Sequence, residues 1–158
     1  MDAKTYETLS NRPPFESTEP VLRSLTIEFA NHIADAQLRT LAYLAGQRLA
    51  KQYPIDGVQT IDQFEQQANT LMTELSWGWV TVEAKPSSID FVHGCTPLKR
   101  WFGEMSMSWA PGLFEGVFAG WMRQLGASEL LDVREVIAAD AVNSETLRFR
   151  FAHQSTFA

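Results

Sequence analysis

Apolar residues recur at helical spacing through the first third of the chain. One stripe consists of Leu22, Leu25, Phe29 and Ile33, and a similar stripe continues through Leu38, Leu41, Ala45 and Leu49. Spacings of three and four residues put such side chains on one face of an α-helix. From Val21 onwards the pattern therefore predicts helix, either one long helix or two with a break near His32–Asp35. Pro54 and Gly57 are expected to end it.

A second helix is predicted to begin after Thr60. The side chain of Thr60 can accept a hydrogen bond from the backbone of Gln63, and Gln63 can reach back, which is the arrangement of a capping box. An apolar stripe at helical spacing follows, and it contains Ile61, Phe64, Ala68, Leu71, Met72 and Leu75.

The periodicity changes at Trp77. Aromatic and β-branched residues dominate from Trp77 to Ala84, as in strands. The residues 85–88 have turn composition, and Ile89–His93 is expected to return as the partner strand. On a strand, residues two apart share a face, so Trp77 and Trp79 are expected to face the same side.

The last third repeats the order of a helix followed by a hairpin. Pro111 suits the first turn of a helix and Gly126 suits the residue just past its end. Strands are predicted at Val133–Ala139 and Thr146–Ala152, joined by residues 140–144. The order predicts an α+β fold: N-terminal helices, then a β-hairpin, a helix and a second β-hairpin, with an antiparallel sheet of about four strands packed on helices.

Length and composition fit this picture. The chain has 158 residues, 45% of them hydrophobic, which is close to the usual size of one domain. Residues 1–20 contain Pro13, Pro14 and Pro20 among polar residues and are predicted to form an N-terminal arm. Residues 21–158 are predicted to form a single domain.

The charge excludes some classes of partner. With 13 basic and 19 acidic residues the net charge is −6, which disfavours general binding to nucleic acids. No apolar run has the length of about 18 residues that a membrane span needs. Residues 1–20 lack the pattern of a signal peptide, so we expect a cytoplasmic protein.

Candidate catalytic and metal-binding residues are sparse. His93 and Cys95 lie two residues apart, but no second pair of ligands is near, so we expect a strand-end histidine, a small buried thiol and no metal or cofactor. A carboxylate pair such as Glu104 and Glu115 could hydrolyse a glycosidic bond. With 19 acidic residues, chance explains such a pair better, and a non-catalytic protein is favoured.

Three glycines inside the third predicted helix need an explanation. Gly112, Gly116 and Gly120 lie four residues apart on one stripe, beside Trp121. Each costs about 0.8–1 kcal/mol relative to alanine, and the usual compensation is the close approach of another backbone. The approaching helix could belong to the same chain or to a second subunit, so these residues are a candidate oligomer interface.

The chain is also rich in aromatic residues, with five Trp, ten Phe and three Tyr. A domain of this size is not expected to bury every Trp. Exposed aromatic rings mark protein interfaces or platforms on which sugars stack. Tyr6, Trp79 and Trp101 are therefore candidate contacts for a partner protein or for a glucan.

Two segments of the chain, together with the order of helices and hairpins, resemble the D-subunit family of bacterial cellulose synthase. They are residues 75–80 (Leu-Ser-Trp-Gly-Trp-Val), followed by a short strand ending at His93, and residues 109–116 (Trp-Ala-Pro-Gly-Leu-Phe-Glu-Gly), continuing to Gly120 and Trp121. The resemblance extends from about Leu25 to His153. It implies a non-catalytic accessory subunit of the cellulose secretion machinery.

The resemblance also implies partners. Subunits of this family assemble as dimers that build an octamer, and they act on the ordered bundling of cellulose. The expected partners are copies of the chain itself and other cellulose synthase subunits. A proline-rich or disordered linker protein and β-1,4-glucan are further candidates. The family has often been placed in the periplasm, which is the alternative to a cytoplasmic ring or filament beside the synthase.

Overall fold

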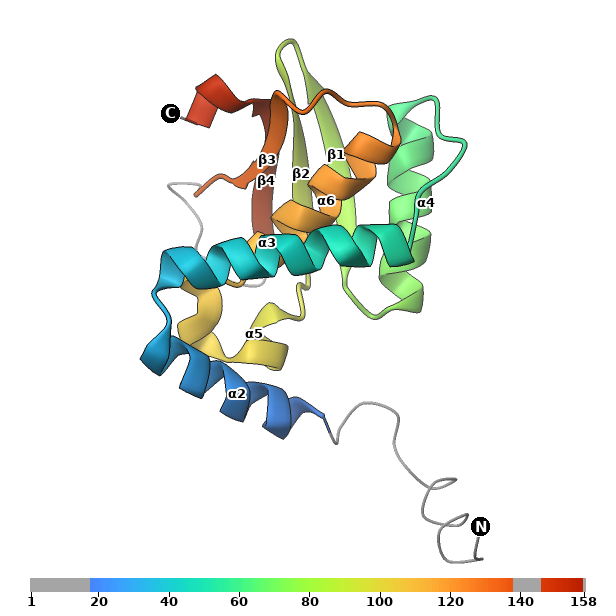
Figure 1. The fold of residues 1–158 in the computed structure, drawn as a ribbon. Helices are drawn as coiled ribbons and strands as arrows, with labels where there is room; N and C mark the ends of the chain where they lie inside the picture. The colour runs from blue at the N-terminus through green and yellow to red at the C-terminus, as the bar shows by residue number, and fades with distance from the viewer. Residues whose placement is uncertain (1–17, 138–145, 158) are drawn as a thin grey trace, which may run out of the picture.

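In the computed structural model, residues 18–137 and 146–157 are described (Figure 1). Three helices come first: α2 (Glu19–His32), α3 (Asp35–Gln52) and α4 (Ile61–Glu74). Of the two alternatives for the first stretch, the structure has two helices with a break, because the backbone is extended at Ile33 and Ala34. At the start of α4 the Thr60 hydroxyl accepts a hydrogen bond from the Gln63 N–H at 3.2 Å, as the capping box predicts.

The strands form one antiparallel sheet in the order β1–β2–β4–β3. Their bounds are Trp79–Lys85, Ser88–Gly94, Leu131–Glu135 and Thr146–His153 for β1 to β4. Helix α6 (Gly112–Gln124) separates the two hairpins. Between Gly94 and Trp109 the chain forms the short helix α5 (Leu98–Phe102) and the 3-10 turn η1 (Glu104–Ser108). The predicted α+β order is confirmed.

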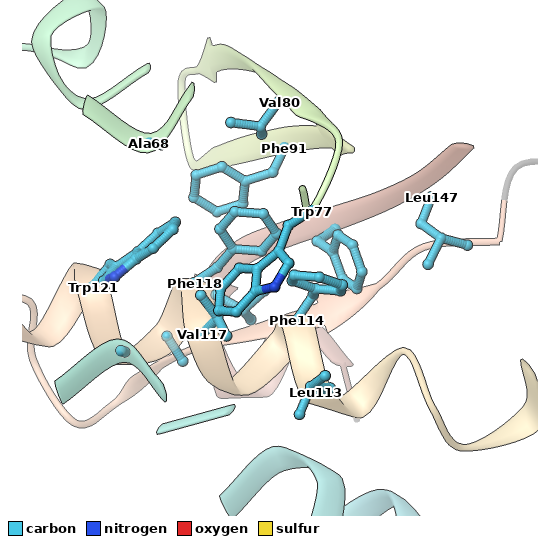
Figure 2. Packing of buried hydrophobic residues seen from close by; sticks show 14 of the residues in the cluster. Ala68, Trp77, Val80, Phe91, Leu113, Phe114, Val117, Phe118, Trp121 and Leu147 are labelled. Carbon is cyan, nitrogen blue, oxygen red and sulfur yellow. The ribbon is translucent and has the colours of Figure 1, made fainter. Parts of the chain in front are cut away.

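Helix α6 lies between the sheet and α3 (Figure 1). On the sheet side its rings contact those of the central strand, where Phe118 stacks on Phe91 with ring centroids 4.7 Å apart. Phe114 and Trp121 extend this cluster along the helix (Figure 2). The core is therefore aromatic between α6 and the sheet, whereas α3 contacts the opposite side of α6.

Trp77 and Trp79 do not face the same side, so that prediction is wrong. Trp77 is buried in the core and Trp79 is 43% exposed. The strand begins only at Trp79, and two turn residues, Ser76 and Gly78, have positive φ angles of 55° and 97°. The left-handed backbone at Ser76 and Gly78 turns the chain between the two tryptophans. Residues two apart therefore do not share a face here, as they would on a regular strand.

The third strand also begins earlier than predicted. It runs from Leu131 to Glu135 because Leu131 pairs with His153 and Val133 with Phe151. Ile137, which falls within the predicted strand, is 86% exposed beyond the observed end. The predicted connection, residues 140–144, lies outside the described residues, as does most of the predicted N-terminal arm.

The free edge of β1 is covered by side chains of α4. The Asn69 amide accepts a hydrogen bond from the Val80 N–H at 2.9 Å and donates one to the Val80 carbonyl at 2.8 Å. Glu65 accepts a further bond from the Val82 N–H at 2.7 Å. Edge strands with unpaired backbone groups can pair with other chains, and here α4 occupies three of those groups.

Candidate functional site

The glycines of α6 face α3 of the same chain. A Cβ atom added at Gly116 would lie 2.0 Å from the Tyr43 carbonyl oxygen, and one at Gly120 would lie 2.5 Å from the Ala50 Cβ. Gly112, Gly116 and Trp121 are buried. The glycines of α6 therefore allow the close approach of a helix of the same chain. They present little surface to a second subunit.

The contacting face of α3 consists mainly of small residues. Its buried positions are Leu38, Ala42, Gly46 and Ala50, spaced by four residues. A Cβ atom at Gly46 would lie 1.9 Å from the Leu113 carbonyl oxygen. The stripe predicted for this helix is partly wrong, because Leu41 is 54% exposed. The spacing of small residues in 42–50, matched to that in 112–120, was the signal in the sequence that could have identified this pair.

A buried carboxylate fastens α3 and α6 to the edge of the sheet. Glu115 is 0% exposed, and its Oε1 accepts hydrogen bonds from Arg39 at 2.6 Å and from the Glu135 N–H at 2.7 Å. Arg39 also bonds the Glu135 carboxylate at 3.0 Å. Burial raises the pKa of Glu135, and Arg39 opposes that shift. Glu115 therefore occupies one backbone N–H at the edge strand β3.

A second group of charges adjoins the first. Asp132 accepts a hydrogen bond from the Tyr43 hydroxyl at 2.7 Å and forms an ion pair with Arg134 at 3.0 Å. Arg123 donates to the Tyr43 oxygen at 3.2 Å. Burial, together with the bond to Asp132, raises the pKa of Tyr43. With the Arg39 group, three arginines face three carboxylates, and the arrangement holds the elements together.

The two carboxylates considered for hydrolysis lie in different environments. Glu115 is buried in the ion-pair group described above, and Glu104 pairs with Lys99 at 2.8 Å at the surface. Within residues 18–137 and 146–157, no cluster of three His, Cys, Asp or Glu side chains could hold a metal ion. Cys95 is exposed rather than buried, because the left-handed backbone at this residue, φ 54°, takes the chain out of β2.

His93 is a buried strand-end histidine, as predicted. Its Nε2 lies 2.7 Å from the Trp77 carbonyl oxygen, so this nitrogen carries the proton and donates it. Its ring lies edge-on to Phe114 with centroids 4.2 Å apart. The Nδ1 atom has no hydrogen-bond partner among the described residues. Burial lowers the pKa of His93 from 6.5 to about 4, and the Trp77 carbonyl opposes that shift.

This burial predicts a loss of stability in mild acid. The unfolded chain binds a proton at His93 near pH 6.5 while the folded chain stays neutral there until about pH 4. The contribution of neutral His93 to the free energy of unfolding should therefore be complete above pH 6.5. As the pH drops towards 4, the free energy of unfolding should fall by up to about 3 kcal/mol. Urea unfolding at pH 7 and pH 4.5 measures this loss. His93→Phe should flatten the dependence in that window, and an unchanged slope would contradict the assignment.

The candidate aromatic contacts differ in their exposure. Trp101 is half-buried, with its ring 6.3 Å from that of Trp77, and Tyr6 lies outside the described residues. Trp79 lies over a glycine of the neighbouring strand: a Cβ atom at Gly94 would come within 2.2 Å of its indole ring. Gly94 therefore leaves room for an indole on the surface of the sheet.

Helix α2 exposes an apolar face. Val21, Leu22, Leu25 and Phe29, which we call the α2 face, are each between 37% and 59% exposed. The helix projects from the domain and packs mainly on α5 (Figure 1). In the described part of the chain, no helix is both long and apolar enough to cross a membrane. The α2 face is thus a continuous apolar surface that the packing of the described residues leaves uncovered.

Two sequence comparisons identify similar proteins. The family model that describes the D-subunit of cellulose synthase matches residues 5–150. The cellulose synthase operon protein D of Komagataeibacter xylinus is 33% identical over 95 residues, which are 56% of this chain and 61% of that protein. The matched region thus spans less than two thirds of that relative's length.

Among solved structures, one resembles the fold and a second has a lower similarity. The phenol-responsive sensory domain of the transcription activator PoxR, solved with phenol, has a TM-score of 0.53 at 16% identity, over 97% of this chain and 92% of that one. An Fe(II) unliganded H-NOX protein mutant from K. algicida has a TM-score of 0.48 at 14% identity, over 94% and 78% of the two chains. At such identity the likeness to the sensory domain concerns the fold alone.

Proposed function

The chain belongs to the D-subunit family of cellulose synthase, and from this premise we propose that it is a non-catalytic scaffold subunit. Its role lies in bacterial cellulose synthesis. In our proposal, copies associate as dimers that build a ring-like octamer. This ring organises synthase complexes, or the glucan chains they make, for ordered cellulose, and it contacts other subunits of the complex.

The α2 face carries this proposal. Exposed apolar patches on soluble domains mark interaction sites, and Val21, Leu25 and Phe29 follow each other at about one turn of helix. Fully burying a leucine or phenylalanine side chain contributes about 1.5–3 kcal/mol. A second copy of the chain offers the same apolar face, so the two α2 faces can cover each other around a two-fold axis.

The remainder of the molecule supports contact through helices. Asn69 and Glu65 occupy three backbone groups of the β1 edge, and Glu115 occupies one N–H of the β3 edge. The small-residue stripes of α3 and α6 are used within the chain. Pairing of sheets or glycine stripes between subunits is therefore disfavoured, whereas the α2 face and the exposed Leu41 and Leu44 of α3 are apolar helix surfaces that stay available.

Charged substitutions on the α2 face should dissociate the oligomer. We expect wild-type protein at tens of micromolar to have the mass of a dimer or octamer in size-exclusion chromatography with light scattering. The double variant Leu25→Glu/Phe29→Glu should have the 17.8 kDa mass of one chain and an unchanged circular dichroism spectrum, because its carboxylates would be buried unpaired in the interface.

A matched control lies on the same helix. Ile27 is 60% exposed and lies about 200° around the helix from Leu25, so Ile27→Glu should leave the mass unchanged. A monomeric wild type at this concentration would contradict the scaffold proposal. An oligomeric double variant would move the interface away from the α2 face.

We place the scaffold on the cytoplasmic side of the membrane, beside the synthase. The exposed thiol of Cys95 supports this choice, because free thiols persist in a reducing compartment. A glucan chain that leaves the synthase on the far side would not then pass through the ring. The periplasm remains the alternative location, and there direct contact with glucan becomes the more natural mechanism.

Direct glucan binding is a second candidate function, which the Trp79 platform favours. An indole held on the surface of the sheet can stack on the apolar face of a β-1,4-linked glucose unit. Trp79→Ala should weaken the binding of cellohexaose about tenfold in a calorimetric titration, whereas Thr81→Ala, two residues along the same strand, should not. A wild-type chain that shows no heat of binding at millimolar sugar would remove this candidate.

A further inference from the structure

A hollow in the domain is lined almost entirely by apolar side chains. It lies between the start of α4, the β1–β2 hairpin and the end of α6, and its volume is about 200 Å³. Phe64 and Phe91, both buried, line its inner part. Its walls are half-buried side chains: Val82, Ile89, Met122 and Leu125. Among the described residues, none that lines the hollow carries a charge.

The hollow opens to the surface, because Gln59 and Thr60 at its rim are exposed and its walls are only half-buried. Ligand pockets are concave and mostly apolar, with a few polar groups that orient the ligand. An apolar cavity of about 150 Å³ can hold benzene, so the volume here is sufficient for one aromatic ring. A guest of this size would cover apolar surface of Phe64 and Phe91 and of the half-buried walls.

The polar residues of the lining lie where α4 begins. The Thr60 hydroxyl accepts its hydrogen bond from Gln63, and an accepting hydroxyl keeps its own proton as a donor. Gln59, the other polar lining residue, is exposed, as is Thr60. A guest with one polar group would therefore direct it towards Thr60 and place its apolar part against Phe64 and Phe91.

We propose that this hollow binds a small uncharged molecule of the size of a single aromatic ring, with at most one polar group. The inference rests on the volume of the hollow and on its apolar, uncharged lining, and it does not depend on the scaffold function. A cationic or anionic guest is disfavoured because the lining offers it no counter-charge. Such a molecule would be bound by each folded chain, whatever its oligomeric state.

A titration followed by methyl NMR tests the proposal on the full chain. Benzyl alcohol is the probe, and benzoate is a charged analogue of similar shape. We expect saturable shifts in the methyl signals of Val82, Ile89, Met122 and Leu125 with benzyl alcohol, and at least tenfold weaker binding of benzoate. An absence of saturable shifts at millimolar benzyl alcohol would overturn the proposal. Shifts confined to the α2 face would also overturn it.

Neighbouring residues of β1 provide matched variants. Val82→Phe adds a ring inside the hollow, whereas Thr81→Phe adds the same ring on the opposite face of the strand. Val82→Phe should weaken the binding of benzyl alcohol at least tenfold, and Thr81→Phe should leave it unchanged. Equal affinity of the two variants would contradict the site. Where Val82→Phe does not fold, Leu125→Phe replaces it in the same comparison.

Discussion

Gly116→Leu is expected to remove a large part of the protein's stability. A Cβ atom at this position would lie 2.0 Å from the Tyr43 carbonyl oxygen and 3.0 Å from the Gln47 backbone nitrogen. Backbone cannot move aside as a flexible side chain can, so α3 would have to leave α6. We expect a loss of at least about 4 kcal/mol, against the roughly 5–15 kcal/mol that is typical of a folded protein. Urea unfolding followed by circular dichroism measures this loss.

Gly57→Leu is the matched control. Gly57 has a φ of 69° and no atom within 4 Å of an added Cβ, so only the left-handed backbone opposes a side chain there. The cost should be about 1–2 kcal/mol. A Gly116→Leu protein with wild-type stability would contradict the helix pairing. A folded variant that has lost only its oligomeric mass would instead assign the glycines of α6 to a subunit interface.

Glu115→Ala is the second substitution with a large expected effect. It removes an ion-pair partner that Arg39 and Arg134 share, and it removes the acceptor of the Glu135 N–H. Breaking a buried ion pair by removing one partner typically costs about 3–5 kcal/mol. We expect a loss in this range by urea unfolding. Glu115→Gln should lose less, because an amide oxygen can still accept the hydrogen bond of the Glu135 N–H.

A double-mutant cycle separates the Arg39–Glu115 interaction energy from the other contributions to the loss of stability. Removing Arg39 as well removes the arginine that is hydrogen-bonded to Glu115, so Glu115→Ala/Arg39→Ala should cost clearly less than the sum of the two single variants. Glu104→Ala is the control, because this carboxylate is 77% exposed, and its loss should stay within about 0.5 kcal/mol. Additive effects in the cycle would contradict the described network.

Local signals in the sequence predicted the elements well. The cap of α4 could be predicted because the Thr60 hydroxyl and the Gln63 N–H are only three residues apart in the chain. The alternation of Leu147, Phe149 and Phe151 identified β4. The order of helices and hairpins, together with the segments around Trp77 and Trp109, was also sufficient to suggest the family. These signals act within one element, where periodicity determines which side chains share a face.

Contacts between distant segments could not be predicted in the same way. The Arg39–Glu115 pair joins residues 76 positions apart, and a charged residue on a helix gives no indication of its partner. Leu22, Leu25 and Phe29 of the predicted stripe share one face of α2, whereas Ile33 lies just beyond the helix in extended backbone. Periodicity cannot say whether a helix of the same chain covers that face. The two indoles of Trp77 and Trp79 were misplaced because left-handed residues adjoin the start of the strand, and only Gly78 signals such a backbone in the sequence.

The side chains that cover the sheet edges have a consequence for crowding. In the proposed scaffold, the chain would be present at high local concentration, where exposed strand edges can pair with those of other copies. Asn69 on one edge and Glu115 on the other hinder the addition of a further strand, since each occupies a backbone group that an incoming strand would need. Strand-by-strand association of copies is therefore hindered at these positions of the two edges.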